Sequence, residues 1–152
     1  MKPSIWLKIA AGLQAFGTVG HTLATQMPVS RGPQEQTVFS AMQNFHFDLM
    51  GVNRSHWDFL KGYELEITVI FAVLAVLLWQ LSSLSRTNSK EAAPLIVTVL
   101  ICQIFMSILG WMYFVPPPAV VGGLIAICLM VALSAMYRET AVPAVTGQLS
   151  PN

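Results

Sequence analysis

An uncharged apolar run, residues 67–81, is the feature that most limits what this chain can fold into. A bilayer core about 30 Å thick is crossed by roughly 20 helical residues. Counting back that length from Leu84 reaches Glu64, so the acidic residues before the run lie at, or just inside, one membrane surface. We therefore expect a transmembrane helix over residues 60–84. Charged side chains at this depth usually face a cavity or a partner, which makes them candidates for a functional site.

The composition also indicates a membrane protein. Of the 152 residues, 55% are hydrophobic and only 10% are charged, whereas soluble domains carry about 25% charged residues. The length suits one domain, residues 1–152, and the net charge of +1 gives no indication of a nucleic-acid partner. Cys102 and Cys128 both lie in apolar runs without zinc-type spacing, so we expect packed thiols and no metal site.

Three further apolar runs predict membrane spans over residues 5–25, 95–114 and 119–137. The polar residues 84–94 are expected to form a turn, the prolines at 116–118 a tight hairpin, and residues 138–152 a polar tail. We expect the first span to be retained in the protein, because no small-x-small cleavage pattern follows it.

The one long polar segment lies between the first two spans. Its residues 37–50 place Val38, Met42, Phe45 and Leu49 near i, i+4, i+7 spacing, which is typical of an amphipathic helix lying on a membrane surface. The predicted fold is therefore all-α: an integral membrane four-helix bundle with an amphipathic surface helix between helices 1 and 2.

Basic residues near the ends of the spans predict the orientation. The side with both termini carries five of them and the other side three; the two groups are Lys2, Lys8, Arg86, Lys90 and Arg138 against Arg31, Arg54 and Lys61. This asymmetry places both termini in the cytoplasm, with the amphipathic helix on the outer side.

The acids before the second span fall on two adjoining helical faces. One face carries Asp58, Gly62 and Glu66, and the other carries Trp57, Lys61 and Glu64. Lys61 can neutralise Asp58 or Glu64 as an interfacial salt bridge, and Arg54 can pair with Asp58. Glu66 has no cation three or four positions away, so we expect it to face the bundle interior, where a carboxyl group that retains its proton can act as a general acid.

His21 is the single histidine within a predicted span. It lies about 24 Å along a helix that starts at Ile5, at 1.5 Å per residue, in the same layer as Glu64 and Glu66. It is either a hydrogen-bonded packing residue, a proton-transfer group or a ligand of haem iron. The two His-aromatic-Asp triplets, His46 to Asp48 and His56 to Asp58, match a metal site only weakly. We expect them instead to fix the amphipathic helix to the start of the second span.

Two functional classes follow. In the first, the protein binds a lipophilic small molecule or membrane lipid near its outer face, with isomerase, cyclase or epoxide-opening chemistry and no cofactor. Glu66 or Glu64 is then the proton donor and Asp58 or His21 the base. Trp57, Tyr63 and Tyr113 shape the pocket, Gly62 leaves room in it, and Gln103 supplies a polar lining.

The second class is a non-enzymatic accessory or assembly subunit of a membrane complex, in which the acids make salt bridges to a partner. Glycine-lined helix faces then provide contacts between copies in a homo-oligomer; the glycines are Gly12, Gly17, Gly20, Gly122 and Gly123. A third alternative is a redox protein that binds haem or quinone through His21.

Several short motifs resemble a family of small, uncharacterised bacterial four-helix membrane proteins. They are WLKIAA and GHT in the first span, RSHWDF before the second, and YFVP before the fourth. The resemblance covers nearly the whole chain and implies four helices in a bacterial inner membrane, but it implies no activity. In that family a second glycine usually stands where this chain has Glu64. Membrane sterol isomerases and terpene cyclases are similar in architecture alone.

Overall fold

The structure is a computed structural model that describes residues 2–27 and 32–141. Its elements, in chain order, are α1 (Pro3–Gln26), α2 (Pro33–Asn44), β1 (His46–Leu49), β2 (Val52–Ser55), α3 (His56–Thr87), α4 (Ser89–Tyr113) and α5 (Pro116–Ala141). The predicted all-α class is confirmed, apart from one short hairpin. Arg31 and residues 142–152, which the sequence assigned to an outer loop and a polar tail, lie outside the described residues.

Three of these helices, α3, α4 and α5, are long and apolar enough to cross a membrane. The helix predicted as the first span, α1, is not among them, because its polar residues lower its mean hydropathy; they include Lys8, Gln14, Thr18 and His21. The observed helices α3, α4 and α5 cover the other three predicted spans and extend beyond them at most of their ends.

The described residues form two compact units. The core unit contains the residues up to Gly17 and those from Ala72 onward, and the hairpin unit contains Thr18–Phe71. Helices α1 and α3 each contribute one part to each unit.

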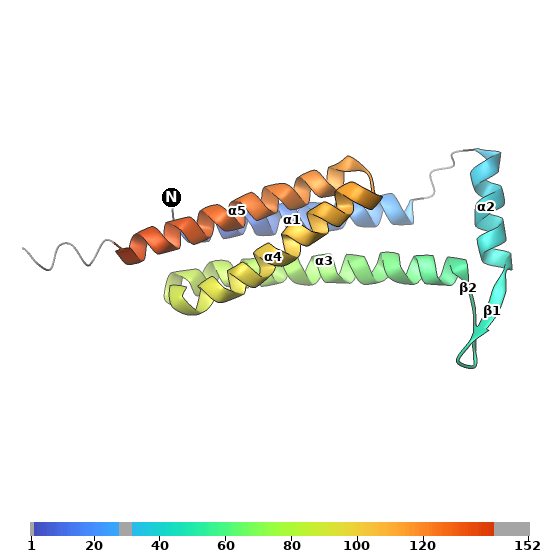
Figure 1. Cartoon of the computed structure of the whole chain (residues 1–152), viewed down its shortest axis with the longest axis horizontal. Helices are drawn as coiled ribbons and strands as arrows, with labels where there is room; N and C mark the ends of the chain where they lie inside the picture. The colour runs from blue at the N-terminus through green and yellow to red at the C-terminus, as the bar shows by residue number, and fades with distance from the viewer. Residues whose placement is uncertain (1, 28–31, 142–152) are drawn as a thin grey trace, which may run out of the picture. The chain divides into compact units, whose positions relative to one another are not determined.

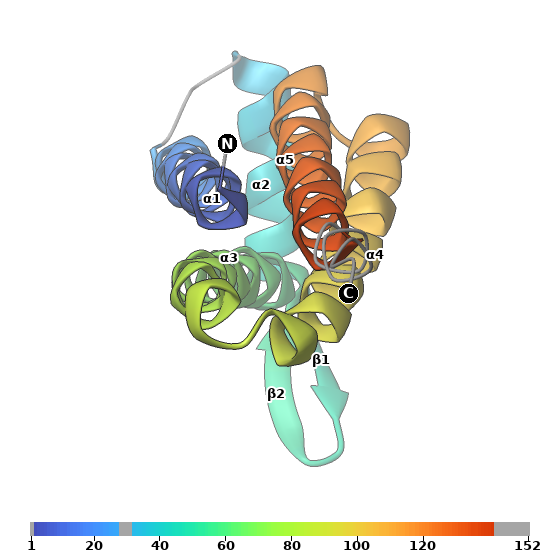
Figure 2. The ribbon, with the colours of Figure 1, turned by 90° about the vertical axis from the view of Figure 1, so that its left-hand side faces the viewer.

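The core unit is built on apolar side chains from four helix segments. Leu7 of α1, Leu78 of α3, Ile96 of α4 and Leu129 of α5 are all fully buried in one cluster. Small residues bring α4 and α5 together: an added Cβ at Gly110 would lie 3.6 Å from Ala119. Figures 1 and 2 show α4 and α5 as antiparallel neighbours joined by a short turn.

The connections between the last three helices are shorter than predicted. Asn88 alone separates α3 from α4, and its side chain accepts a hydrogen bond from the Glu91 amide at 3.3 Å, which caps α4. Pro94, placed by the sequence in a turn, lies inside α4. Pro116 begins α5, because a proline in the first helical turn removes an N–H group that has no helical partner anyway.

The predicted amphipathic helix over residues 37–50 is wrong in its second half. Helix α2 ends at Asn44, and a two-stranded antiparallel hairpin follows, with Leu49 paired to Val52. Met50 and Gly51 form its turn with φ values of 54° and 80°. Two successive residues with positive φ are typical of the turns that close hairpins. Residues 45–49 fit a strand because Phe45, Phe47 and Leu49 alternate, and the turn at Met50 favours a hairpin. These two signals outweigh the helical spacing of Val38, Met42, Phe45 and Leu49.

Candidate functional site

Most of the predicted site residues lie in the hairpin unit, around the end of α1 and the start of α3. These are His21, Trp57, Asp58, Gly62, Tyr63, Glu64 and Glu66. The other two, Gln103 and Tyr113, belong to the core unit.

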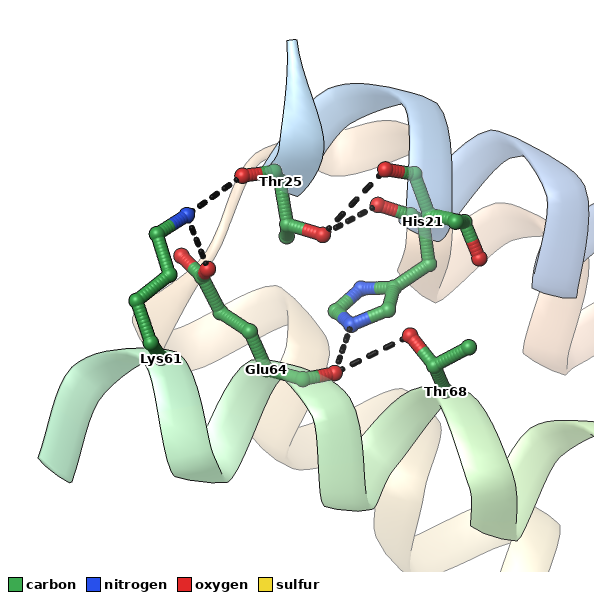
Figure 3. A network of polar contacts seen from close by, with 6 residues as sticks. His21, Thr25, Lys61, Glu64 and Thr68 are labelled. Atoms are coloured by element: carbon green, nitrogen blue, oxygen red, sulfur yellow. Dashed lines mark hydrogen bonds and ion pairs between the residues drawn. The ribbon is translucent and has the colours of Figure 1, made fainter. Parts of the chain in front are cut away.

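Lys61 is the centre of a polar network that joins α1 to α3 (Figure 3). Its ammonium group donates to the Glu64 carboxylate at 2.7 Å and to the Thr25 carbonyl oxygen at 2.8 Å. Thr25 lies in the last turn of α1, where carbonyl groups lack a helical partner, so Lys61 caps this helix end. The predicted salt bridge between Lys61 and Glu64 is therefore confirmed.

His21 contacts the same turn of α3 through its ring. Its Nε2 atom lies 3.2 Å from the Glu64 carbonyl oxygen, which also accepts from the Thr68 hydroxyl at 3.0 Å (Figure 3). A carbonyl oxygen only accepts, so Nε2 carries the hydrogen of this bond. The Phe71 ring lies edge-on to the imidazole at 5.5 Å. In this geometry His21 is a packing residue between two helices, one of the roles predicted for it.

The Trp57 ring packs between a cation and another ring. The Lys61 ammonium lies 5.1 Å from the Trp57 ring centroid, and Phe39 of α2 meets the same ring edge-on at 5.1 Å. A cation over an indole face is an attractive arrangement. Trp57 thus links α2 to the Lys61 network.

Asp58 is engaged at the start of α3. Its carboxylate accepts from the Ser55 amide at 2.8 Å, while the Ser55 hydroxyl accepts from the Asp58 amide at 3.2 Å. This reciprocal pair is a capping box. The Ser-x-x-Asp spacing was a readable signal for it in the sequence, where we instead expected Arg54 as the partner. Arg54 donates to the Asn53 carbonyl at 3.1 Å.

Glu66 does not face an interior. Its side chain is exposed and forms no hydrogen bond or ion pair with any residue in the described part of the chain. Together with Leu65, Val69 and Ile70 it lines a shallow, open hollow on α3. The sequence correctly showed that no local cation is available, but it could not show which way this face of α3 points.

The predicted ligand-binding residues are divided between the two units, and each is described within its own unit. A Cβ added at Gly62 would meet nothing within 4 Å, and Tyr63 is exposed beside Phe59. In the core unit, the buried Gln103 amide donates to the Gln14 side chain at 2.6 Å, and Tyr113 is exposed at the end of α4.

A cluster of aromatic rings lies at the base of the hairpin. Phe45 stacks on His56 at 5.7 Å, and Phe47 stacks on Phe59 at 5.8 Å with an interplanar angle of 13°. These contacts tie β1 and the residue before it to the first turn of α3. The alternating aromatic residues before Met50 were the signal for a strand, because successive strand residues point to opposite faces.

The arrangement therefore offers few groups for chemistry. Glu64 is ion-paired, Asp58 caps a helix and His21 holds a carbonyl group, which leaves Glu66 as the one predicted catalytic group without a structural contact among the described residues. In residues 2–27 and 32–141, no three His, Cys, Asp or Glu side chains gather in a way that could hold a metal ion. Comparisons with family models, curated proteins and solved structures find no match to this chain.

Proposed function

We propose that this chain is an integral protein of a bacterial inner membrane that crosses the bilayer four times, with both termini in the cytoplasm. The apolar helices α3, α4 and α5 support three of these spans. For α1, the support is its packing in the core unit: its buried residues Leu7, Ala10 and Gln14 face the other helices. Ser82 of α3 also donates to the Ser4 carbonyl at 3.0 Å. Polar residues of α1 that are buried against other helices do not face lipid, so the helix can cross a membrane with a lower mean hydropathy.

Aromatic and cationic residues support a position for α3 in the bilayer. Near the start of α3, the Lys61 ammonium lies over the Trp57 ring. Near the other end of α3, the Lys8 ammonium lies 5.5 Å from the Trp79 ring centroid. The stretch of α3 from Trp57 to Trp79 corresponds to about 33 Å of α-helix at 1.5 Å per residue. Such pairs of tryptophans are typical of the two membrane interfaces. Glu66 then lies inside the interface marked by Trp57.

Within this membrane, we propose that the protein acts as a non-enzymatic accessory or assembly subunit. The observation that carries this proposal is the Glu66 carboxylate, exposed on α3 beside Leu65, Val69 and Ile70. A carboxylate on a lipid-facing helix surface is costly unless it is paired. Lys61 already bonds to Glu64 and to Thr25, so we propose that a lysine or arginine on a partner helix pairs with Glu66.

A photocrosslinking experiment in native membranes tests this proposal. With a photoreactive residue in place of Val69, we expect one protein adduct of defined mass. Glu66→Lys should reduce its yield at least tenfold by setting a cation against a cation, whereas Glu64→Gln should leave it unchanged because Glu64 faces Lys61. Lipid adducts alone, or a protein adduct insensitive to Glu66→Lys, would contradict the accessory role.

A second candidate function is the binding of a lipophilic small molecule at the same hollow, with Glu66 as proton donor. The hollow favours it because one acid stands among apolar side chains. It ranks second because the hollow is open, and because its lining residues, Leu65, Glu66, Val69 and Ile70, include no base. Native mass spectrometry of the protein in lipid nanodiscs tests it: a retained ligand should be lost in Glu66→Gln and kept in Glu64→Gln.

A redox role through His21 has less support than either candidate. The Nε2 atom, a usual ligand of haem iron, is hydrogen-bonded to the Glu64 carbonyl. Haem binding would require this bond to break. A visible absorption spectrum of the purified protein with a Soret band would establish haem binding against this expectation.

A further inference from the structure

The turn of the β1–β2 hairpin carries an unusual residue. Met50 has a φ of 54° and is 99% exposed. Left-handed backbone is unfavourable for most side chains, and hairpin turns of this kind usually carry Asn-Gly or Asp-Gly. In water, Asn or Asp would be favoured at this position, because each tolerates the left-handed backbone and each is well solvated. A long apolar side chain at this position therefore indicates a surrounding other than water.

The residues beside Met50 extend the apolar surface. Leu49 is 49% exposed and Val52 is 44% exposed, and the turn between them is closed by Gly51. Charged and amide side chains begin only at Asp48 on one strand and Asn53 on the other. We call the four residues 49–52 the hairpin tip. This tip has no charge, which suits the boundary between headgroups and acyl chains of a bilayer.

The base of the hairpin holds the tip in a defined direction. The ring contacts of Phe45 with His56 and of Phe47 with Phe59 fasten β1 and Phe45 to the first turn of α3, and β2 runs into α3 without a break at Ser55. Within the hairpin unit, Figures 1 and 2 show α2 and the hairpin running across the first part of α3 rather than along it. An element that crosses a membrane-spanning helix near its end lies along the membrane surface.

We propose that the β1–β2 hairpin is an interfacial anchor whose tip inserts into the headgroup–acyl boundary of the membrane that α3 crosses. This inference rests on the proposed membrane location and adds the lipid interface as the partner of the tip. The continuity of β2 with α3 keeps the tip near the level of Trp57, where an aromatic residue marks the same interface.

Fluorescence quenching in reconstituted vesicles tests the anchor. In a background of Cys102→Ser and Cys128→Ala, a bimane label is placed at Met50→Cys, with Asn53→Cys as the polar control in the same hairpin. The full chain is reconstituted in equal parts of phosphatidylcholine and phosphatidylglycerol. We expect iodide to quench the Met50→Cys label several-fold less than the Asn53→Cys label, and lipids brominated near the headgroup end of the acyl chain to quench it strongly.

A third label separates this inference from the membrane location itself. Val73→Cys lies on an exposed apolar position of α3, within the proposed span. If bromolipids quench the Val73→Cys label but not the Met50→Cys label, the anchor is wrong and the membrane location stands. If they quench neither, both are wrong. Shielding of the Met50→Cys label from iodide and from bromolipids alike would indicate a protein contact and would also overturn the anchor.

A polar variant separates insertion from folding. Met50→Asn suits the left-handed turn and removes the apolar side chain, so the hairpin should form at least as readily. With the label at Leu49→Cys, we expect bromolipid quenching to fall several-fold in this variant while its unfolding temperature in detergent does not decrease. Unchanged lipid quenching in Met50→Asn would contradict a role of Met50 in insertion.

Discussion

The core unit and the hairpin unit are held together by different interactions. In the core unit, large side chains such as Leu78, Ile96 and Leu129 are fully buried between helices. In the hairpin unit, Ser55 is the one buried residue among the described positions 18–27 and 32–71. Contacts there are polar or aromatic, and they join α1, α2, the hairpin and α3 at single points such as Lys61 and Trp57.

This difference indicates how the two units respond to change. Buried apolar packing is shared among many atoms, so a steric error in the core unit disturbs several neighbours at once. A hydrogen bond in the hairpin unit contributes about 1 kcal/mol, and its loss opens the structure locally. We expect substitutions in the core unit to lower the free energy of unfolding and those in the hairpin unit to act mainly on local opening.

The largest effect is expected where α4 and α5 meet. A side chain at Gly122 would collide with the Ser107 hydroxyl, whereas one at Gly123 would enter open space. Gly122→Leu should lower the free energy of unfolding by about 3 kcal/mol, because overpacking forces the helices apart. Gly123→Leu, its matched control, should not lower it, because the added side chain meets no neighbour and leucine has a higher helix propensity than glycine. Unfolding in detergent measures both, and equal effects would show that α4 and α5 do not pack as described.

The next effect concerns the buried amide pair of the core unit. Gln14 and Gln103 are 3% and 4% exposed. Gln103→Leu should cost about 2 kcal/mol, since it leaves the Gln14 amide without this partner in an apolar setting. The double variant with Gln14→Leu should recover part of this loss. A double-mutant cycle on unfolding in detergent measures the coupling, and additive losses would contradict the pairing.

A smaller and more local effect is expected in the hairpin unit. Lys61→Met removes the salt bridge to Glu64 and the hydrogen bond to Thr25, and should cost about 1 kcal/mol. Amide hydrogen exchange should accelerate in the last turn of α1, with little change in α4 and α5. Glu64→Gln should have about half this effect, because the amide oxygen can still accept from Lys61. Faster exchange throughout α4 and α5 would show that the two units do not respond separately.

The smallest effect is expected at Gly62. An alanine there meets no neighbour within 4 Å, so Gly62→Ala should raise the free energy of unfolding by about 0.5 kcal/mol through the higher helix propensity of alanine. Gly12→Ala is the matched control: an added Cβ at Gly12 also meets nothing within 4 Å, but Gly12 lies in the core unit. A destabilised Gly62→Ala protein would indicate a contact at this position and would support the predicted ligand pocket.

Local signals in the sequence were sufficient for much of the fold. Apolar runs predicted α3, α4 and α5, and i, i+3 spacing predicted the pair of Lys61 and Glu64. The hairpin was missed because the spacing of Phe45 and Leu49 fits both a helix and a strand. Whether this segment forms a helix or a strand depended on the turn at Met50 and on ring contacts with His56 and Phe59. These residues lie outside the strand.

The candidate site divides in the same way. The sequence determined which groups are available: an apolar helix with acids near one end, a histidine in α1 and a cation beside Glu64. Those properties depend on residues within one or two turns of each other. Only the tertiary structure decided that His21 bonds to the Glu64 backbone, that Gln14 meets Gln103, and that Glu66 is exposed. These depend on how separate helices meet, and a helical pattern specifies a face without specifying what covers it.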